Sequence, residues 1–398
     1  MRHTNRQHRW LRAPAVLPVV LIITSLAAAA DLKPRQIIAE FEVAPDGDFL
    51  RVPVTIRQKE FTFLVNTGLV TSAIDDGLQK SLELPRMRVE VRGKRGGQVR
   101  EHFGGLEATL GNIPLELPAG VETADYAALR DRLDLECQGE IGMDVLQRYI
   151  MQIDFDQGIL RFLTSLPPSP GEMFRITPLG GEGGAPTIAA TIPGIPSEKF
   201  VVSTGRAGSA LELRNELFSE LVEQQQVRIL DKDKGITRSG SRLYQFGRLD
   251  AVQVGKFRHE GLIVNGSEQN AISLSYLARY VVTFDFPRNK LYLKKGRTFD
   301  FPDDHFTLWD VTVDRDSEKV VVREVSGYGP ARRIGLQAGD IVESINDCRT
   351  RRLSNWQVRR LFGREGRPLK AVVLRGAERL TLETGATAAT SAASDEEK

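Results

Sequence analysis

The sequence predicts a mainly β protein with two similar halves and a smaller third unit. Short runs that alternate apolar and polar residues, such as residues 37–65, are separated by glycine-containing turns, as in strands joined by hairpins. The 36 glycines and the aromatic content of 7% favour frequent turns over long helices. A length of 398 residues is enough for two or three domains, each able to bury a core.

Two motifs recur along the chain and define the halves. Residues 63–68 and 200–205 each form a short apolar run that ends in X-Thr-Gly, and they lie 137 positions apart. Residues 141–149 and 272–280 match at a spacing of 131 positions, through shared Ile, Leu, Arg and Tyr residues. Repetition of two motifs at a nearly constant spacing indicates an internal duplication.

Each half is also expected to contain a helix. In the second half, Leu213, Leu217 and Leu221 recur at helical spacing and predict a helix over residues 211–226. A shorter helix is expected over residues 145–149 in the first half.

Each half resembles a retropepsin-like aspartic peptidase domain. The resemblance is carried by X-Thr-Gly, by a glycine-bearing hairpin after it, and by the Ile-Gly-x-Asp-x-Leu pattern of residues 141–146. It covers most of residues 35–297 and implies two pseudo-symmetric acid-protease lobes, residues 31–164 and 172–297, joined by a proline-rich linker at residues 165–171. In that family two such halves form one active site, so a monomer of this fused chain is sufficient to form it.

The positions that carry the chemistry in this family have changed. Aspartic peptidases use two close carboxylates, one as an acid and one as a base toward the same water. Asn66 and Ser203 stand at those positions, and neither an amide nor an isolated hydroxyl can replace a carboxylate near neutral pH. Because one positioned general base is worth about 10²–10⁴ in rate, no catalytic residue is expected at this degenerate dyad. The resemblance implies that the remaining loop residues still hold the two loops together: Thr67, Gly68, Thr204 and Gly205.

Residues 300–385 resemble a bacterial PDZ domain of the type attached to secreted proteases. The resemblance is carried by Gly-Pro-Ala at residues 329–331 and by Gly-Leu-Gln-Ala-Gly-Asp-Ile-Val at residues 335–342. It implies a groove that adds an extended peptide to a sheet edge and holds C-terminal carboxylates. Asp303 and Asp304 just upstream disfavour such a carboxylate by like charge. The candidate groove residues flank the carboxylate-binding loop expected just before the first strand, or lie on a helix over residues 354–362: Phe306 and Leu308 at the loop, and Trp356, Val358 and Leu361 on the helix.

Three interpretations of the function remain open. The first is a pseudoprotease that binds peptides or proteins in a cleft between the lobes, in the PDZ-like groove, or in both. The second is an active aspartic-type or rearranged endopeptidase acting on secreted proteins, which requires a carboxylate or a histidine within hydrogen-bonding reach of Ser203. The third is a structural scaffold whose cleft is occluded by its own side chains.

The side chains that could supply other chemistry are scattered. His102, His259 and His305 do not cluster in the sequence, so neither a metal nor a cofactor is expected. Asp75 and Asp76 lie too far along the chain to replace the missing carboxylate, and are expected to cap a turn or a helix.

The N-terminus predicts a secretory signal peptide over residues 1–30. A basic stretch is followed by a short apolar run at residues 16–26 and by four alanines ending at Ala30, near which cleavage is expected. Four of the 54 basic residues and no acid fall in this leader, which leaves 50 basic against 52 acidic residues. This balance gives no reason to expect nucleic acid as a partner. The signal peptide predicts a secreted or periplasmic protein. No other stretch has the ~20 apolar residues of a membrane span.

The cysteines and the C-terminal segment can also be interpreted from the sequence. Cys137 and Cys348 fall in different units and are interpreted as a buried small residue and a loop residue rather than as a disulfide framework. Residues 386–398 are rich in Ala, Thr, Ser and acids, and predict a disordered tail.

Overall fold

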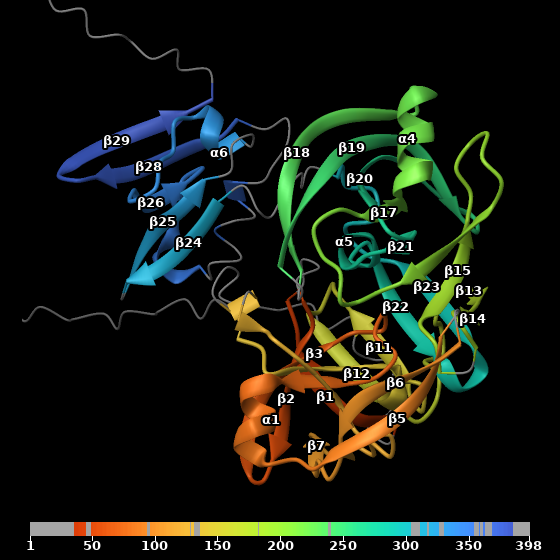
Figure 1. Ribbon diagram of the computed structural model, residues 1–398. Helices are drawn as coiled ribbons and strands as arrows, with labels where there is room; N and C mark the ends of the chain where they lie inside the picture. The colour runs from red at the N-terminus through yellow and green to blue at the C-terminus, as the bar shows by residue number, and fades with distance from the viewer. Residues whose placement is uncertain are drawn as a thin grey trace, which may run out of the picture.

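The structure is a computed structural model, shown in Figure 1. It describes residues 36–44, 49–93, 96–127, 129–130, 136–181, 183–237, 240–303, 311–316, 318–325, 330–353, 358, 361–362 and 368–384. The predicted signal peptide and the predicted tail lie outside these residues.

The first half is built almost entirely of short strands. Its elements are β1 (Ile37–Glu42), β2 (Arg51–Ile56), β3 (Lys59–Val65), β4 (Ala73–Asp75), α1 (Asp76–Leu82), β5 (Arg86–Gly93), β6 (Gly96–Phe103), β7 (Ala108–Leu110), β8 (Ile113–Pro114), β9 (Glu122–Ala124), β10 (Gly139–Ile141), α3 (Met143–Leu146), β11 (Ile150–Asp154) and β12 (Ile159–Leu163).

The second half follows the same plan with longer hairpin strands. Its elements are β13 (Glu172–Arg175), β14 (Thr177–Pro178), β15 (Pro186–Ala190), β16 (Glu198–Val202), β17 (Leu211–Arg214), α4 (Asn215–Glu223), β18 (Val227–Thr237), β19 (Gly240–Val254), β20 (Phe257–Ser267), β21 (Ala271–Ile272), α5 (Leu274–Leu277), β22 (Tyr280–Asp285), a 3-10 turn (Phe286–Arg288) and β23 (Lys290–Lys295).

The duplication seen in the sequence is repeated in the strand pairing. In the first half β10 runs parallel to β3 and antiparallel to β4; in the second half β21 runs parallel to β16 and antiparallel to β17. The registers also agree, because Val65 faces Ile141 and Val202 faces Ile272. Each X-Thr-Gly loop therefore leaves a buried parallel strand at the same point of its own sheet.

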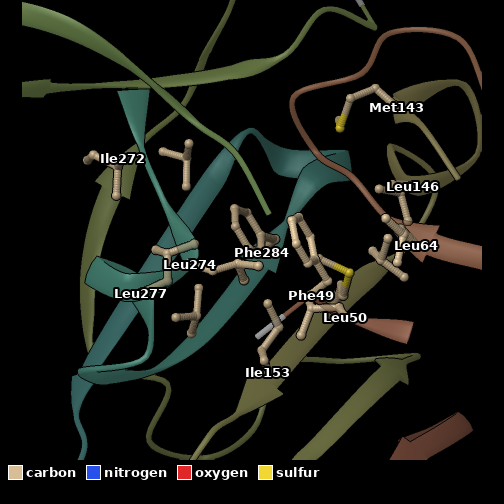
Figure 2. Packing of buried hydrophobic residues seen from close by; sticks show 14 of the residues in the cluster. Phe49, Leu50, Leu64, Met143, Leu146, Ile153, Ile272, Leu274, Leu277 and Phe284 are labelled. Atoms are coloured by element: carbon tan, nitrogen blue, oxygen red, sulfur yellow. The ribbon is translucent and has the colours of Figure 1, made fainter. Parts of the chain in front are cut away.

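The halves are joined by one shared sheet and one shared core. The order of the six-stranded sheet is β1-β12-β11-β22-β23-β13, and its centre is the antiparallel pair β11 and β22. In Figure 1 these two strands meet where the orange and yellow half adjoins the green and teal half. Figure 2 shows Phe49 of the first half facing Phe284 of the second, both within one cluster of buried residues. Each Å² of apolar surface buried in this common core contributes about 25 cal/mol to stability, so the two halves stabilise each other.

Two helix predictions were wrong in their bounds. Residues 211–214 form strand β17, and α4 begins only at Asn215. Leu211 and Leu213 are buried and alternate with half-buried residues because β17 pairs with β20 and β21, so strand pairing overrides the helical leucine spacing. In the first half the helix is α3, four residues that start directly after the extended Gly142 rather than at residue 145.

The third unit has its own sheet and its own core. Its elements are β24 (Val311–Asp316), β25 (Lys319–Val325), α6 (Pro330–Arg333), β26 (Ile341–Ile345), β27 (Cys348–Arg349), a 3-10 turn (Thr350–Arg352), β28 (Lys370–Arg375) and β29 (Glu378–Glu383). The main path is β24-β25-β26-β28-β29, with β27 on β26. A separate cluster that includes Val320, Ile345 and Phe362 fills this unit.

The structure also shows the state of the two cysteines and the character of the helices. Cys137 is buried, Cys348 is exposed, and both are free thiols. Among the described residues, none of the helices has the length and apolar character needed to cross a membrane.

Candidate binding site at the loop junction

The two X-Thr-Gly loops meet at one place, here called the loop junction (residues 66–68 and 203–205). The backbone N–H of Asn66 donates to the carbonyl of Ile141 at 3.0 Å, and that of Ser203 donates to Ile272 at 2.9 Å. These equivalent bonds continue the parallel strand pairing by one residue on each side. The duplicated strands therefore hold the first residue of each loop in an equivalent position.

Four reciprocal hydrogen bonds fasten the loops to each other. Thr67 Oγ1 donates to the carbonyl of Val202 at 2.7 Å and accepts from the N–H of Thr204 at 3.1 Å. Thr204 Oγ1 donates to the carbonyl of Val65 at 2.6 Å and accepts from the N–H of Thr67 at 3.0 Å. Both threonines are buried, with 0% and 1% of their surface exposed. Water cannot reach their polar groups, so these bonds are what satisfies them.

The glycines of the junction have no room for a side chain. A Cβ on Gly68 would lie closer than 3.0 Å to Ser203 Oγ, and a Cβ on Gly205 would lie closer than 3.0 Å to the Asn66 side chain. Each glycine thus allows one loop to approach the polar side chain of the other.

Asn66 and Ser203 face each other across this contact. The Ser203 hydroxyl lies 3.5 Å from Asn66 Oδ1, which also accepts from the N–H of Gly68 at 2.9 Å. Asn66 is half-buried and Ser203 is 1% exposed. Within the described part of the chain, neither a carboxylate nor a histidine forms a hydrogen bond with Ser203, and the serine therefore has no base beside it.

The structure adds an acid that the sequence analysis missed. Asn66 Nδ2 donates to Glu140 Oε1 at 3.1 Å, and the Tyr126 hydroxyl donates to Glu140 Oε2 at 3.1 Å. Glu140 lies on β10 and is 7% exposed. The equivalent position of the second half, 131 residues later, is Ala271, which is fully buried. An acid inside a buried apolar strand in only one of two repeats was the signal available in the sequence.

The other acids of the first half have structural roles. Asp75 caps α1 by accepting from the N–H groups of Gly77 and Leu78, as expected. Asp144 accepts from the Ser72 hydroxyl at 2.6 Å and the Ser72 N–H at 2.9 Å, and burial raises the pKa of its carboxyl. These contacts keep both carboxylates engaged away from Ser203.

The two histidines among the described residues contact different residues, and neither takes part in the hydrogen bonds of the junction. His102 Nδ1 contacts the carbonyl of Ala119 at 2.8 Å. His259 Nε2 lies 2.5 Å from the Tyr280 hydroxyl, and its ring packs against Phe299. Burial lowers the pKa of His259 to about 4, and nearby Arg279 contributes to the shift. His305 lies outside the described residues.

The third unit is held by an ion pair beneath a glycine-rich turn. Arg375 forms bonds of 2.7 and 2.8 Å to the carboxylate of Asp340, which is fully buried, and it also donates to the carbonyl of Gly335. Asp340 Oδ2 accepts from the N–H of Gln337 at 2.9 Å. Gly335 and Gly339 have φ of 85° and 91°, which explains the glycines of this motif.

Comparison with known protein families places this unit. Residues 308–385 match the family model described as PDZ domain. This segment is a PDZ domain. The match covers the third unit alone and does not extend to the two lobes. Among curated proteins, none matches the chain.

The candidate groove residues of the PDZ domain are only partly described. Val358 is fully buried in the core of the PDZ domain, and Leu361 is partly buried against that core. Phe306, Leu308 and Trp356 lie outside the described residues, so the peptide-binding roles of all five remain predictions.

Asp303 belongs to the second half rather than to the PDZ domain. Its Oδ2 accepts from the N–H of Ile263 at 2.9 Å, and its carbonyl accepts from Arg248 at 2.9 Å. Asp303 is 7% exposed, and its expected repulsion of a peptide carboxylate stays a prediction. Asp304 lies outside the described residues.

Proposed function

We propose that the protein binds extended peptides or protein segments at two places, the PDZ domain and the loop junction of two retropepsin-like lobes. For the PDZ domain, peptide binding is the activity typical of the fold. For the lobes, one observation carries the proposal. Two X-Thr-Gly loops are locked by reciprocal threonine bonds and bring Asn66 and Ser203 within 3.5 Å of each other.

The retropepsin-like assignment of the lobes is supported by the repeated pairing of strands. The parallel pairs β3 with β10 and β16 with β21 each lead to an X-Thr-Gly loop followed by a short strand and a helix. A hairpin follows in each half, β5 with β6 and β18 with β19. The assignment rests on this arrangement together with the sequence resemblance.

Peptide cleavage by the paired-carboxylate mechanism is not part of the proposal. That mechanism needs two acids that share one proton at the junction. The amide of Asn66 and the hydroxyl of Ser203 retain hydrogen-bonding capacity but lack that proton chemistry. Binding without turnover is what the remaining groups support.

We place this activity outside the cytoplasm. The proposal rests on the signal peptide predicted from residues 1–30 and not on any structural feature. A fusion of these residues to a reporter that is active only after export would test it.

Binding at the junction can be separated from binding at the PDZ domain. Peptides with amidated C-termini lack the carboxylate that a PDZ loop holds, so their binding reports on other sites. Val70, two residues beyond Gly68, is 52% exposed, so replacing its side chain removes little buried surface. We expect Val70→Glu to weaken binding of amidated unfolded peptides by about tenfold or more, equal to about 1.4 kcal/mol.

A matched control is available in the second half. Met173 is 51% exposed and lies on β13, so Met173→Glu adds the same charge at an equally exposed apolar residue. This variant should bind like the wild type. The proposal fails for the junction if amidated peptides do not bind, or if the two glutamate variants bind equally.

Glu140 favours a second candidate function, hydrolysis by a single carboxylate. Its Oε1 lies 3.1 Å from Asn66 Nδ2, so a base and an amide donor stand side by side at the junction. Turnover of unfolded protein substrates between pH 3 and 8, lost in Glu140→Gln, would support this candidate. Absence of turnover in the wild type would reject it.

A further inference from the structure

The carboxamide of Asn66 lies between one acceptor and one donor. On one side, Oε1 of the Glu140 carboxylate lies 3.1 Å from Nδ2 of Asn66. On the other side, the backbone N–H of Gly68 points at Oδ1 of Asn66 at 2.9 Å. An N–H can only donate and a carboxylate oxygen accepts, so chemistry fixes which end of the amide faces which neighbour.

We infer that Glu140 is the positioning residue of the junction and that Asn66 and Glu140 form a matched pair. Glu140 holds the NH₂ group of Asn66 and so turns Oδ1 toward Gly68 and the Ser203 hydroxyl. A carboxylate at position 66 would instead place two anionic oxygens at hydrogen-bonding distance with no hydrogen between them.

The pairing explains why only the first half carries the acid. The second half has Ala271 where the first has Glu140, and Ser203 where the first has Asn66. A serine hydroxyl can donate or accept and needs no partner of fixed polarity. An asparagine beside a buried carboxylate gains a defined orientation from it.

A consequence follows for any return to acid-protease chemistry. Replacing Asn66 and Ser203 by aspartate would create three neighbouring carboxyl groups rather than the two that share one proton. A neutral residue at position 140 is therefore required as a third change.

Unfolding measurements on a double-mutant cycle test the pairing without any ligand. Asn66→Asp should destabilise the two lobes at pH 7, where both carboxyl groups are ionised in the unfolded chain. Sharing one proton raises the pKa of the pair in the folded state, so the lost stability should return as the pH falls toward about 4. Each unit of pKa increase corresponds to about a tenfold loss in the folding equilibrium constant at pH 7.

The decisive variant is Asn66→Asp combined with Glu140→Gln. The glutamine amide can donate to the new carboxylate, so the hydrogen bond is restored with its direction reversed. We expect the folding equilibrium constant of this double variant at pH 7 to be at least about tenfold larger than that of Asn66→Asp alone. The pH dependence of stability that Asn66→Asp introduces should be absent from the double variant.

A buried asparagine in the second half provides the control. Asn265 is 5% exposed and its Nδ2 donates to the carbonyl of Gly266 at 2.9 Å, with no contact to Glu140. Glu140→Gln should give no relief to Asn265→Asp. The inference is overturned if Asn66→Asp is as stable as the wild type at pH 7, or if Glu140→Gln rescues neither its stability nor its pH profile. These outcomes do not depend on whether peptides bind.

Discussion

Thr67→Val tests whether the reciprocal bonds hold the lobes together. Valine has nearly the same shape as threonine, so the change removes the hydroxyl without opening a cavity. The carbonyl of Val202 and the N–H of Thr204 then lose partners at 2.7 and 3.1 Å in a buried site. Each buried polar group left unsatisfied costs about 1–3 kcal/mol, so the free energy of unfolding should fall by about 2–6 kcal/mol.

The aromatic residues allow the lobes and the PDZ domain to be followed separately. Trp309 and Trp356 fall within the PDZ domain, whereas six of the seven tyrosines precede it. In a urea titration, Thr67→Val should shift the tyrosine-detected transition and leave the tryptophan-detected transition unchanged. Thr67→Ser keeps the hydroxyl and should cost only about 1 kcal/mol for the lost methyl group. The reasoning is refuted if the valine and serine variants are equally stable.

Two further perturbations have defined outcomes. The free energy of unfolding of the lobes should fall by up to about 3 kcal/mol between pH 6.5 and pH 4. Over this range the unfolded chain binds a proton at His259, whereas the folded state, in which the pKa of His259 is about 4, does not. In urea titrations at several pH values, His259→Phe should reduce this fall. Asp340→Ala leaves Arg375 without its buried partner and should lower the tryptophan-detected stability by on the order of 3 kcal/mol. An equal loss in the tyrosine-detected transition would contradict the separation of the two cores.

The sequence was sufficient for the features that depend on local pattern and repetition. Val65 and Ile141 lie in apolar runs that reappear as Val202 and Ile272, and the structure gives both pairs the same register. The capping role of Asp75 was also predicted from the sequence, because an acid directly before a helix accepts from the first N–H groups of that helix.

Features that depend on tertiary contacts could not be predicted. Leu211 and Leu213 fit a helix by spacing, and only their pairing with β20 and β21 makes them a strand. The role of Glu140 depends on Asn66, 74 positions away in sequence, and on Tyr126. Asp303 looked like part of the PDZ domain until its bond to Ile263 placed it on the second half.

Hydrogen exchange in the presence of a saturating amidated peptide tests the central claim most directly. If the peptide binds at the loop junction, amides in residues 63–70 and in residues 200–207 should both exchange more slowly, since the two loops are bonded to each other. Protection confined to residues 308–385, or protection of neither loop, would contradict a binding site between the lobes.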